Sequence, residues 1–308
     1  MMNVMLDDRQ LGTTQTAPVK TVTIAARDVL GLFKLRIGFM IMITALAGLA
    51  VTPGPQLSLG KMLVLALAVL ISSASAGAFN QYYEHDSDRL MARTRNRAFV
   101  TGALPHSPLW LLLIAVMLAV AVSAVWWVLN PVSAAFVFLG AFFYAVVYTV
   151  WLKRRSAFNI VVGGLAGSFA VLAGAAAIEP HIGPLPLLLA LALFLWTPPH
   201  FWSLAIANQA EYAAAGVPML PVVVGVERAA RIVMWSTVAL AVTVLLPVLF
   251  GAGPIYLVGA LGGGGYFVYK AFCLARAPSR KTAMGAFFAS LIQLGLLLAV
   301  VTLDSLLH

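Results

Sequence analysis

The sequence predicts an all-α, polytopic membrane protein, a bundle of nine transmembrane helices, and three observations predict this fold class. First, 62% of the 308 residues are hydrophobic, against about half in soluble domains. Second, apolar runs of about 20 residues, the length that crosses a bilayer as a helix, recur along the chain. Third, only helices and closed barrels satisfy every backbone polar group in lipid, and runs of this length are helical.

The nine expected spans follow one another with short connections. Asn130-Pro131 separates the third run from the fourth, and a break from Gly251 to Pro254 separates the seventh from the eighth. The expected spans are 35–53, 62–83, 108–129, 132–152, 157–178, 184–206, 229–250, 254–274 and 284–304.

Residues 1–30 are predicted to be a cytoplasmic tail, and residues 31–308 a single transmembrane domain. The tail contains three aspartates and no uninterrupted apolar segment, which excludes a secretory signal peptide. Residues 22–34 are expected to form an interfacial helix with one apolar side.

The formal charge of +9 follows membrane topology. With the N-terminus in the cytoplasm, all but one of the 19 Lys and Arg residues fall on the inner side, and Lys61 is the exception. Because Lys and Arg concentrate in cytoplasmic loops, we expect a multi-pass protein of the cell (inner) membrane with its C-terminus on the outer side. No single basic domain is formed, so nucleic acid is excluded as a partner. The only cysteine, Cys273, excludes an internal disulfide.

Residues 77–102 carry the densest charge in a chain that is 9% charged. One interpretation is a solvated loop whose charges neutralise one another. The other is a metal–diphosphate site at the membrane edge, because carboxylates suit Mg²⁺ and guanidinium groups suit phosphate oxygens. Three acids are followed closely by four arginines: Glu84, Asp86, Asp88, Arg89, Arg93, Arg95 and Arg97.

The spacing of Asn80, Glu84 and Asp88 favours the metal–diphosphate interpretation. Side chains four residues apart lie along one stripe of a helix. Mg²⁺ usually takes one or two carboxylates, keeps several waters and shares the rest of its shell with substrate phosphates. We therefore expect these three side chains to be metal ligands.

A second region follows the fourth run. Tyr148 and Thr149 precede Lys153 and Arg154, and an inward-facing Lys153 can hold a diphosphate, although the basic residues also serve as an orientation signal. The glycines of the next run are expected to serve close helix packing: Gly163, Gly164 and Gly167.

A third region lies within the sixth run, where Pro198 and Pro199 precede His200. Proline removes backbone hydrogen bonds, which predicts a break in this helix. In a membrane such a break is tolerated where it is buried in protein or lines a cavity. Ionisable residues at this depth are functional candidates, so His200 either ligates iron or donates to a freed carbonyl.

The two longest inner loops begin alike. Each starts with Asn-Gln as a helix leaves the membrane and soon reaches a carboxylate and a tyrosine. In the second loop these residues are Asn208, Glu211 and Tyr212. This indicates two related half-sites that face each other, and a chance dipeptide at a polar boundary is the alternative.

Together these motifs resemble the UbiA superfamily of intramembrane prenyltransferases, and within it the heme O synthase (protoheme IX farnesyltransferase) branch. The likeness runs from Lys34 to about residue 231. It rests on several ordered motifs: Asn-x-Tyr-Tyr-acid at 80–84, Met91-x-Arg93-Thr94 followed by Arg97, Tyr148-Thr149-x-x-Leu152-Lys153-Arg154, Asn159-Ile160-x-x-Gly163-Gly164, Thr197-Pro198-Pro199-His200-Phe201, and Tyr212 through Pro221.

The resemblance implies a central cavity open to the cytoplasmic side and transfer of a farnesyl group from farnesyl diphosphate to a vinyl group of heme b, giving heme O and diphosphate. Heme A synthase or terminal-oxidase assembly proteins are the implied protein partners. The implied roles are Mg²⁺ binding by Asn80, Glu84 and Asp88, diphosphate binding by Arg93, Arg97, Lys153, Arg154, Asn208, Glu211 and Tyr212, catalysis that also involves Tyr148, and heme binding by His200.

The sequence departs from the family pattern at three places. Glu84 stands where the family usually has aspartate, Arg97-Ala98 replaces Arg-Pro, and Lys34-Leu35-Arg36 replaces Lys-Pro-Arg. The second acidic motif offers one carboxylate, Glu211, which leaves the number of Mg²⁺ ions open.

Three alternatives compete with heme farnesylation. A prenyltransferase with a quinone-precursor or other aromatic acceptor differs only in branch motifs. A non-catalytic heme-handling assembly factor would need His200 but not the Asn80–Asp88 stripe. A transporter or channel would place acids at mid-depth, whereas the acids here cluster at one membrane face.

Overall fold

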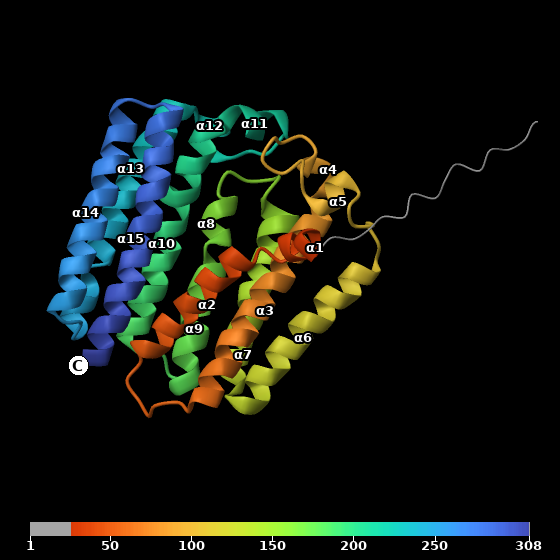
Figure 1. Cartoon of the computed structure of the whole chain (residues 1–308). Coiled ribbons are helices and arrows are strands. Elements are labelled where there is room, and N and C mark those ends of the chain that lie inside the picture. Colours follow the sequence, from red (N-terminus) through yellow and green to blue (C-terminus); the bar gives the residue numbers. More distant parts are fainter. Residues whose placement is uncertain (1–25, 308) are drawn as a thin grey trace, which may run out of the picture.

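The computed structural model describes residues 26–307, and this part of the chain is helical, with no strand among the described residues. The helices stand side by side as one bundle (Figure 1). By length and composition, eight of them could cross a membrane, or up to nine if the bent pair α1 and α2 forms one span. The predicted fold class, an all-α multi-pass bundle, is confirmed, and the predicted nine spans match the upper count.

The long helices agree with the predicted spans to within a few residues at most ends. They are α2 (Leu35–Ala50), α3 (Leu59–Tyr83), α6 (Leu109–Val128), α7 (Pro131–Phe142) with the π-helix η1 (Phe143–Leu152), α8 (Asn159–Gly163) with α9 (Leu165–Ile178), α10 (Pro184–Ala207), α13 (Val226–Thr243) with the 3₁₀ helix η2 (Leu246–Phe250), α14 (Pro254–Arg276) and α15 (Arg280–Leu307).

Short helices precede or connect the long helices of the bundle. A helix, α1 (Ala26–Leu32), lies within the range expected to form an interfacial helix and is bent by 44° from α2; its position at the membrane interface stays a prediction, and the part of that prediction before residue 26 lies outside the described residues. The others connect the spans at one end of the bundle (Figure 1): α4 (His85–Asp88), α5 (Ala98–Thr101), α11 (Gln209–Ala214) and α12 (Leu220–Val224).

The predicted break at the two prolines of the sixth span is wrong. Helix α10 runs without interruption through Pro198 and Pro199. The two prolines remove only the bonds that N–H groups at 198 and 199 would make to the Phe194 and Leu195 carbonyls, and α10 is packed against α9, α13 and α15. Thr197 of α10 nevertheless lines a cavity, which is one of the two settings in which the sequence analysis expects prolines to be tolerated in a membrane helix.

Two apolar cores divide the bundle. One joins α10, α13, α14 and α15 around large side chains such as Phe267 and Leu274. The other joins α2, α3, α6, α7 and α9 and is built mostly from alanine, with Leu65 and Val69 as larger members. Small residues let α2 and α9 approach so closely that a Cβ at Gly174 would overlap the Ala45 carbonyl.

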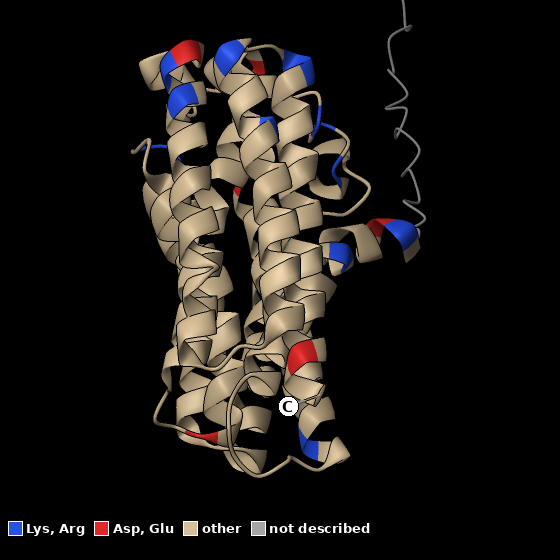
Figure 2. Cartoon of the chain, turned by 90° about the vertical axis from the view of Figure 1, so that its left-hand side faces the viewer, with Lys and Arg blue, Asp and Glu red and all other residues tan. Residues whose placement is uncertain are grey.

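The charged residues gather at one end of the bundle. Figure 2 shows most Lys, Arg, Asp and Glu positions at the end that carries the short connecting helices. Lys61 lies in the first turn of α3, at the other end from Asn80 and Glu84. This polar end is where the site residues meet.

Candidate active site

The predicted stripe of Asn80, Glu84 and Asp88 is present. Although α3 ends at Tyr83, the amide of Glu84 donates to the Asn80 carbonyl over 3.0 Å, and the amide of Asp88 donates to the Glu84 carbonyl over 2.9 Å. The helical register therefore continues into α4. All three side chains are buried, with exposed fractions of 2–3%, so they do not belong to a solvated loop.

Each acid of the stripe is paired with a cation from the predicted set. Lys153, just after η1, forms an ion pair with Glu84. Arg97 lies 2.5 Å from Asp88 Oδ2 and 4.0 Å from Glu84 Oε2. Buried carboxylates are stable only when paired in this way, and the pairing brings segments 84–88, 97 and 153 together.

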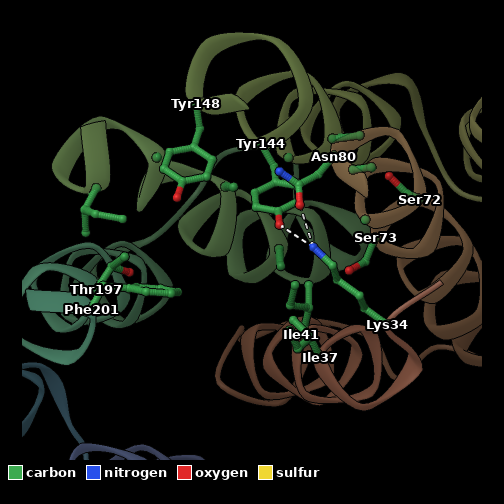
Figure 3. A pocket seen from close by; sticks show the side chains of 18 of the residues that line it. Lys34, Ile37, Ile41, Ser72, Ser73, Asn80, Tyr144, Tyr148, Thr197 and Phe201 are labelled. Carbon is green, nitrogen blue, oxygen red and sulfur yellow. Dashed lines mark hydrogen bonds between the residues drawn. The ribbon is translucent and has the colours of Figure 1, made fainter. Parts of the chain in front are cut away.

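Lys34 is the central residue that the sequence analysis did not assign to the site. Its ammonium group donates to Asn80 Oδ1 over 2.7 Å and to the Tyr144 hydroxyl over 3.2 Å (Figure 3). It has a left-handed backbone, with φ of 47°, and is the one non-glycine residue with positive φ in the described chain. This turn between α1 and α2 sends the side chain inward. The sequence signal that could have identified Lys34 was its position in the Lys34-Leu35-Arg36 motif.

The π-helix η1 presents two tyrosines to the same space. Tyr144 and Tyr148 stack with ring centroids 5.7 Å apart and an interplanar angle of 14°. Thr149, between them and Lys153, accepts a hydrogen bond from the Asn80 amide over 3.2 Å. A Cβ at Gly163 would lie 2.8 Å from the Tyr148 ring, so this glycine makes room for that ring.

Several of these side chains line a cavity of about 260 Å³. Its polar end holds Lys34, Asn80 and Tyr144, and its walls are apolar or small side chains from α2, α3, α7, α9 and α10 (Figure 3). The lining residues are Lys34, Ile37, Ile41, Val69, Ser72, Ser73, Ala76, Gly77, Asn80, Arg93, Arg97, Phe136, Val137, Gly140, Ala141, Tyr144, Tyr148, Lys153, Ile160, Gly163, Ala166, Ala170, Ala173, Thr197, Phe201, Leu204, Tyr212 and Met219.

Of the second predicted half-site, one residue reaches the same cavity. Tyr212, in α11, lines the cavity and bonds to Arg93. Burial raises the pKa of the Tyr212 phenol, and Arg93 opposes that shift, so the hydroxyl remains a donor at neutral pH. Glu211 Oε2 is buried without a hydrogen-bond partner. Asn208 Nδ2 donates to the Leu204 carbonyl.

Six predicted site residues are not among those that line this cavity: Glu84, Asp88, Arg154, His200, Asn208 and Glu211. Glu84 and Asp88 lie behind the lining and pair with the lining residues Lys153 and Arg97. Arg154 is exposed. The His200 ring stacks between Trp196 and Phe287, with centroids 4.2 and 4.6 Å away. Its Nδ1 lies 2.6 Å from Ser290 Oγ. Heme binding by His200 stays a prediction.

The donor set fits Mg²⁺ better than a softer metal. Among the described residues, no three His, Cys, Asp or Glu side chains gather as a metal site. The stripe instead offers two carboxylates and one amide oxygen, hard ligands that leave room for phosphate oxygens. Glu84 Oε2 is buried and has no hydrogen-bond partner, which is the orphaned acceptor that a cation would satisfy.

Relatives with this architecture are known. A model of the UbiA prenyltransferase family matches residues 41–292. The chain is 56% identical over 275 residues to protoheme IX farnesyltransferase 2 of Paramagnetospirillum magneticum, covering 89% of this chain and 96% of that protein. It is 44% identical over 280 residues to protoheme IX farnesyltransferase 1 of the same organism, covering 90% and 98%.

Solved structures share the fold at low sequence identity. A digeranylgeranylglyceryl phosphate synthase superposes with a TM-score of 0.76 at 17% identity, covering 92% of this chain and 99% of that one. A UbiA homologue from Archaeoglobus fulgidus, bound to DMAPP and Mg²⁺, gives 0.69 at 17% identity, covering 89% and 99%. The family model spans most of the chain and the farnesyltransferases match it nearly end to end, so this chain belongs to the UbiA prenyltransferase family.

Proposed function

We propose that this chain transfers the farnesyl group of farnesyl diphosphate to a vinyl group of protoheme IX (heme b), giving heme O and diphosphate. One observation carries the prenyl transfer: an apolar cavity ends in a cluster of cations, most of them partly buried, that pair with buried hard oxygen ligands. The choice of acceptor rests on the 56% identical relative, which is named for protoheme IX.

The polar end of the cavity suits a diphosphate. Arg93, Arg97 and Lys153 line it, and guanidinium groups bind phosphate oxygens in a bidentate manner. The exposed Arg154 and the second half-site, with Asn208, Glu211 and Tyr212, would complete the rim. Fixed cations stabilise charge that develops on a leaving group, most strongly where water is excluded.

Asn80, Glu84 and Asp88 would hold Mg²⁺, which when bound acts as a Lewis acid toward the diphosphate oxygens. The lone acid Glu211, with Asn208 beside it, leaves the number of ions at one or two.

The reaction then needs little from the protein beyond position and shielding. The bond between the first farnesyl carbon and the diphosphate oxygen breaks, and its electron pair leaves with diphosphate. The stacked rings of Tyr144 and Tyr148 offer π faces to the allylic cation. The vinyl electrons of protoheme form the new carbon–carbon bond, and water adds to the remaining cationic carbon and releases a proton.

We infer that protoheme reaches this cavity from the bilayer. Ile37 of α2 and Phe201 of α10 both line the cavity and are 57% and 36% exposed, which supports an opening between these helices. A large apolar acceptor partitions into lipid, so lateral entry suits it. His200, one residue from Phe201 in α10, remains the proposed heme ligand, and the absorption spectrum of bound heme in His200→Ala tests that role.

The location follows from the charge pattern. We place the protein in the cell (inner) membrane, with the N-terminus cytoplasmic and the C-terminus outside, residues 1–30 as a tail and residues 31–308 as one catalytic domain. Heme O serves terminal oxidases, so heme A synthase or oxidase assembly proteins are the proposed recipients of the product.

The test is a reconstituted reaction with purified protein, farnesyl diphosphate, heme b and Mg²⁺. Release of diphosphate should require both substrates and stop on addition of EDTA. Turnover that resists EDTA would contradict the metal assignment, and turnover with a quinone precursor but not with heme b would reassign the acceptor.

A further inference from the structure

We propose that Phe136, with Val69 and Ala173, forms a floor that limits the prenyl chain to three isoprene units. The inference rests on the proposed function, because it concerns the substrate of the same site. These three residues, called the floor below, come from α7, α3 and α9 and all line the cavity at the end away from the cations.

The depth of the cavity fits a farnesyl chain. Asn80 and Val69 are eleven residues apart on α3, a rise of about 16 Å at helical geometry. An extended farnesyl chain has twelve carbons in line and spans about 14 Å at carbon–carbon bonds of about 1.5 Å, and a fourth isoprene unit would add about 5 Å. Three units therefore fit between the polar end and the floor, and four do not.

The cavity walls between the floor and the polar end carry small side chains, which leave the cavity open. Ser73, Ala76 and Gly77 of α3 line the cavity, as do Gly140 and Ala141 of α7. Phe136 is the one phenylalanine that α7 contributes to the cavity, and its ring stacks on Phe169 of α9 with centroids 6.1 Å apart. This stacking therefore holds the Phe136 ring in place at the end of the cavity away from the cations.

The structure beneath the floor is closed. Phe136 packs on the alanine-rich core, which also contains Val69 and Ala173 themselves with Leu65 and Ala134. Directly after Ala173, Gly174 meets the Ala45 carbonyl so closely that no Cβ would fit. The chain cannot extend in this direction without removing floor atoms, since cores of this kind have few voids.

The test compares farnesyl and geranylgeranyl diphosphate as donors to heme b. Phe136→Ala removes six ring carbons, more than the five of an isoprene unit. It should raise the ratio of kcat/KM for geranylgeranyl over farnesyl diphosphate at least tenfold, and Val69→Ala should raise it less. The matched control is Phe138→Ala, because Phe138 lies on the same helix, is 44% exposed and does not line the cavity; its ratio should stay within twofold of wild type.

A second variant works in the opposite direction. Ala170, one turn of α9 nearer the diphosphate, lines the cavity, and Ala170→Leu should shift preference from farnesyl toward geranyl diphosphate. A ratio of two kcat/KM values on one preparation does not depend on the fraction of folded enzyme, so partial misfolding cannot imitate either shift.

If neither Phe136→Ala nor Ala170→Leu changes the ratio of kcat/KM between donors, the proposal that the floor limits chain length is overturned. Wild-type enzyme that uses geranylgeranyl and farnesyl diphosphate equally would also overturn it, since the longer tail would then leave between α2 and α10. Absence of farnesyl transfer to heme b by wild type would instead refute the proposed function, and binding of thiodiphosphate analogues of the three donors would still test the floor without heme.

Discussion

The side chains that would bind Mg²⁺ already have cations as partners. Lys153 pairs with Glu84, Arg97 with Asp88, and the Lys34 ammonium with the neutral Asn80 carboxamide oxygen. Each of the three side chains thus has a cation beside it, and a diphosphate offers those cations a new partner. Binding of metal and diphosphate is therefore expected to be an exchange of partners rather than an addition of charge to an empty pocket.

Asp88 gives the first prediction. Asp88→Asn keeps the size of the side chain but removes its charge, leaving Arg97 without its partner and the metal with one ligand fewer. We expect turnover to fall about 10²–10³-fold, the usual cost of one electrostatic group at the reacting centre, with the thermal unfolding curve retained. Asp86→Asn is the control, since that side chain is 79% exposed; equal losses in both variants would refute a specific role.

Lys34 gives the second prediction. Lys34→Met keeps the length of the side chain and removes the hydrogen bonds to Asn80 and Tyr144. Hydrogen bonds from charged groups contribute about 1.5–3 kcal/mol, so kcat/KM for farnesyl diphosphate should fall about 10- to 100-fold, as measured by diphosphate release. Arg36→Met, two residues away and exposed, should change it little, and wild-type kinetics in Lys34→Met would exclude Lys34 from the site.

Individual residues also show what could and could not be predicted from the sequence. The stripe from Asn80 to Asp88 was predictable, because a period of four residues is local and survives the end of α3. The inward direction of the Lys34 side chain was not predictable, because it depends on one left-handed backbone angle between α1 and α2. Heme binding by His200 remains untested, and two of the residues that surround its ring, Phe287 and Ser290, come from α15, some 90 residues away in sequence.

At the level of helices, one local distortion shapes the cavity. Ten residues of η1 follow π geometry, a form that is rare and concentrates at functional sites. The wider turn brings Tyr144 and Tyr148 into a stack above the cavity. Hydrophobic periodicity does not distinguish α from π turns over so short a stretch, so only the span itself was predicted here.

The glycines of α9 give a helix-scale prediction. A methyl group at Gly174 would overlap the Ala45 carbonyl of α2, whereas Gly167 has nothing within 4 Å of its added Cβ. Gly174→Ala should destabilise the fold by about 1–3 kcal/mol, as overpacking does, and Gly167→Ala should be neutral or stabilising because alanine favours helix. Thermal unfolding in detergent measures both, and equal melting temperatures would contradict the close crossing.

Over the whole molecule, the alternation of charge and hydrophobicity was enough to predict the bundle. Most spans came within a few residues of their ends, because lipid imposes length and helicity on each run independently. The cavity was expected only through family resemblance, since its walls come from five helices whose mutual positions no local pattern encodes. The break predicted at the prolines of α10 was wrong for the same reason, because α10 packs against α9, α13 and α15, which no local pattern encodes.

Membrane orientation gives a whole-molecule prediction. In a Cys273→Ala background, we expect Lys61→Cys to react with an impermeant thiol reagent in intact spheroplasts, and Arg95→Cys only after permeabilisation. Both positions are exposed and lie at opposite ends of the bundle. The opposite labelling pattern would invert the topology and place the site on the outer face.

The central claim is that the buried charges around Asn80 and the cavity beneath them join a farnesyl group to protoheme. Mass analysis of the pigment, after incubation of purified protein with heme b, farnesyl diphosphate and Mg²⁺, tests it most directly. The account predicts a product that has gained one farnesyl group and one hydroxyl group, absent in Asp88→Asn. Recovery of unchanged heme b from active, folded protein would contradict it.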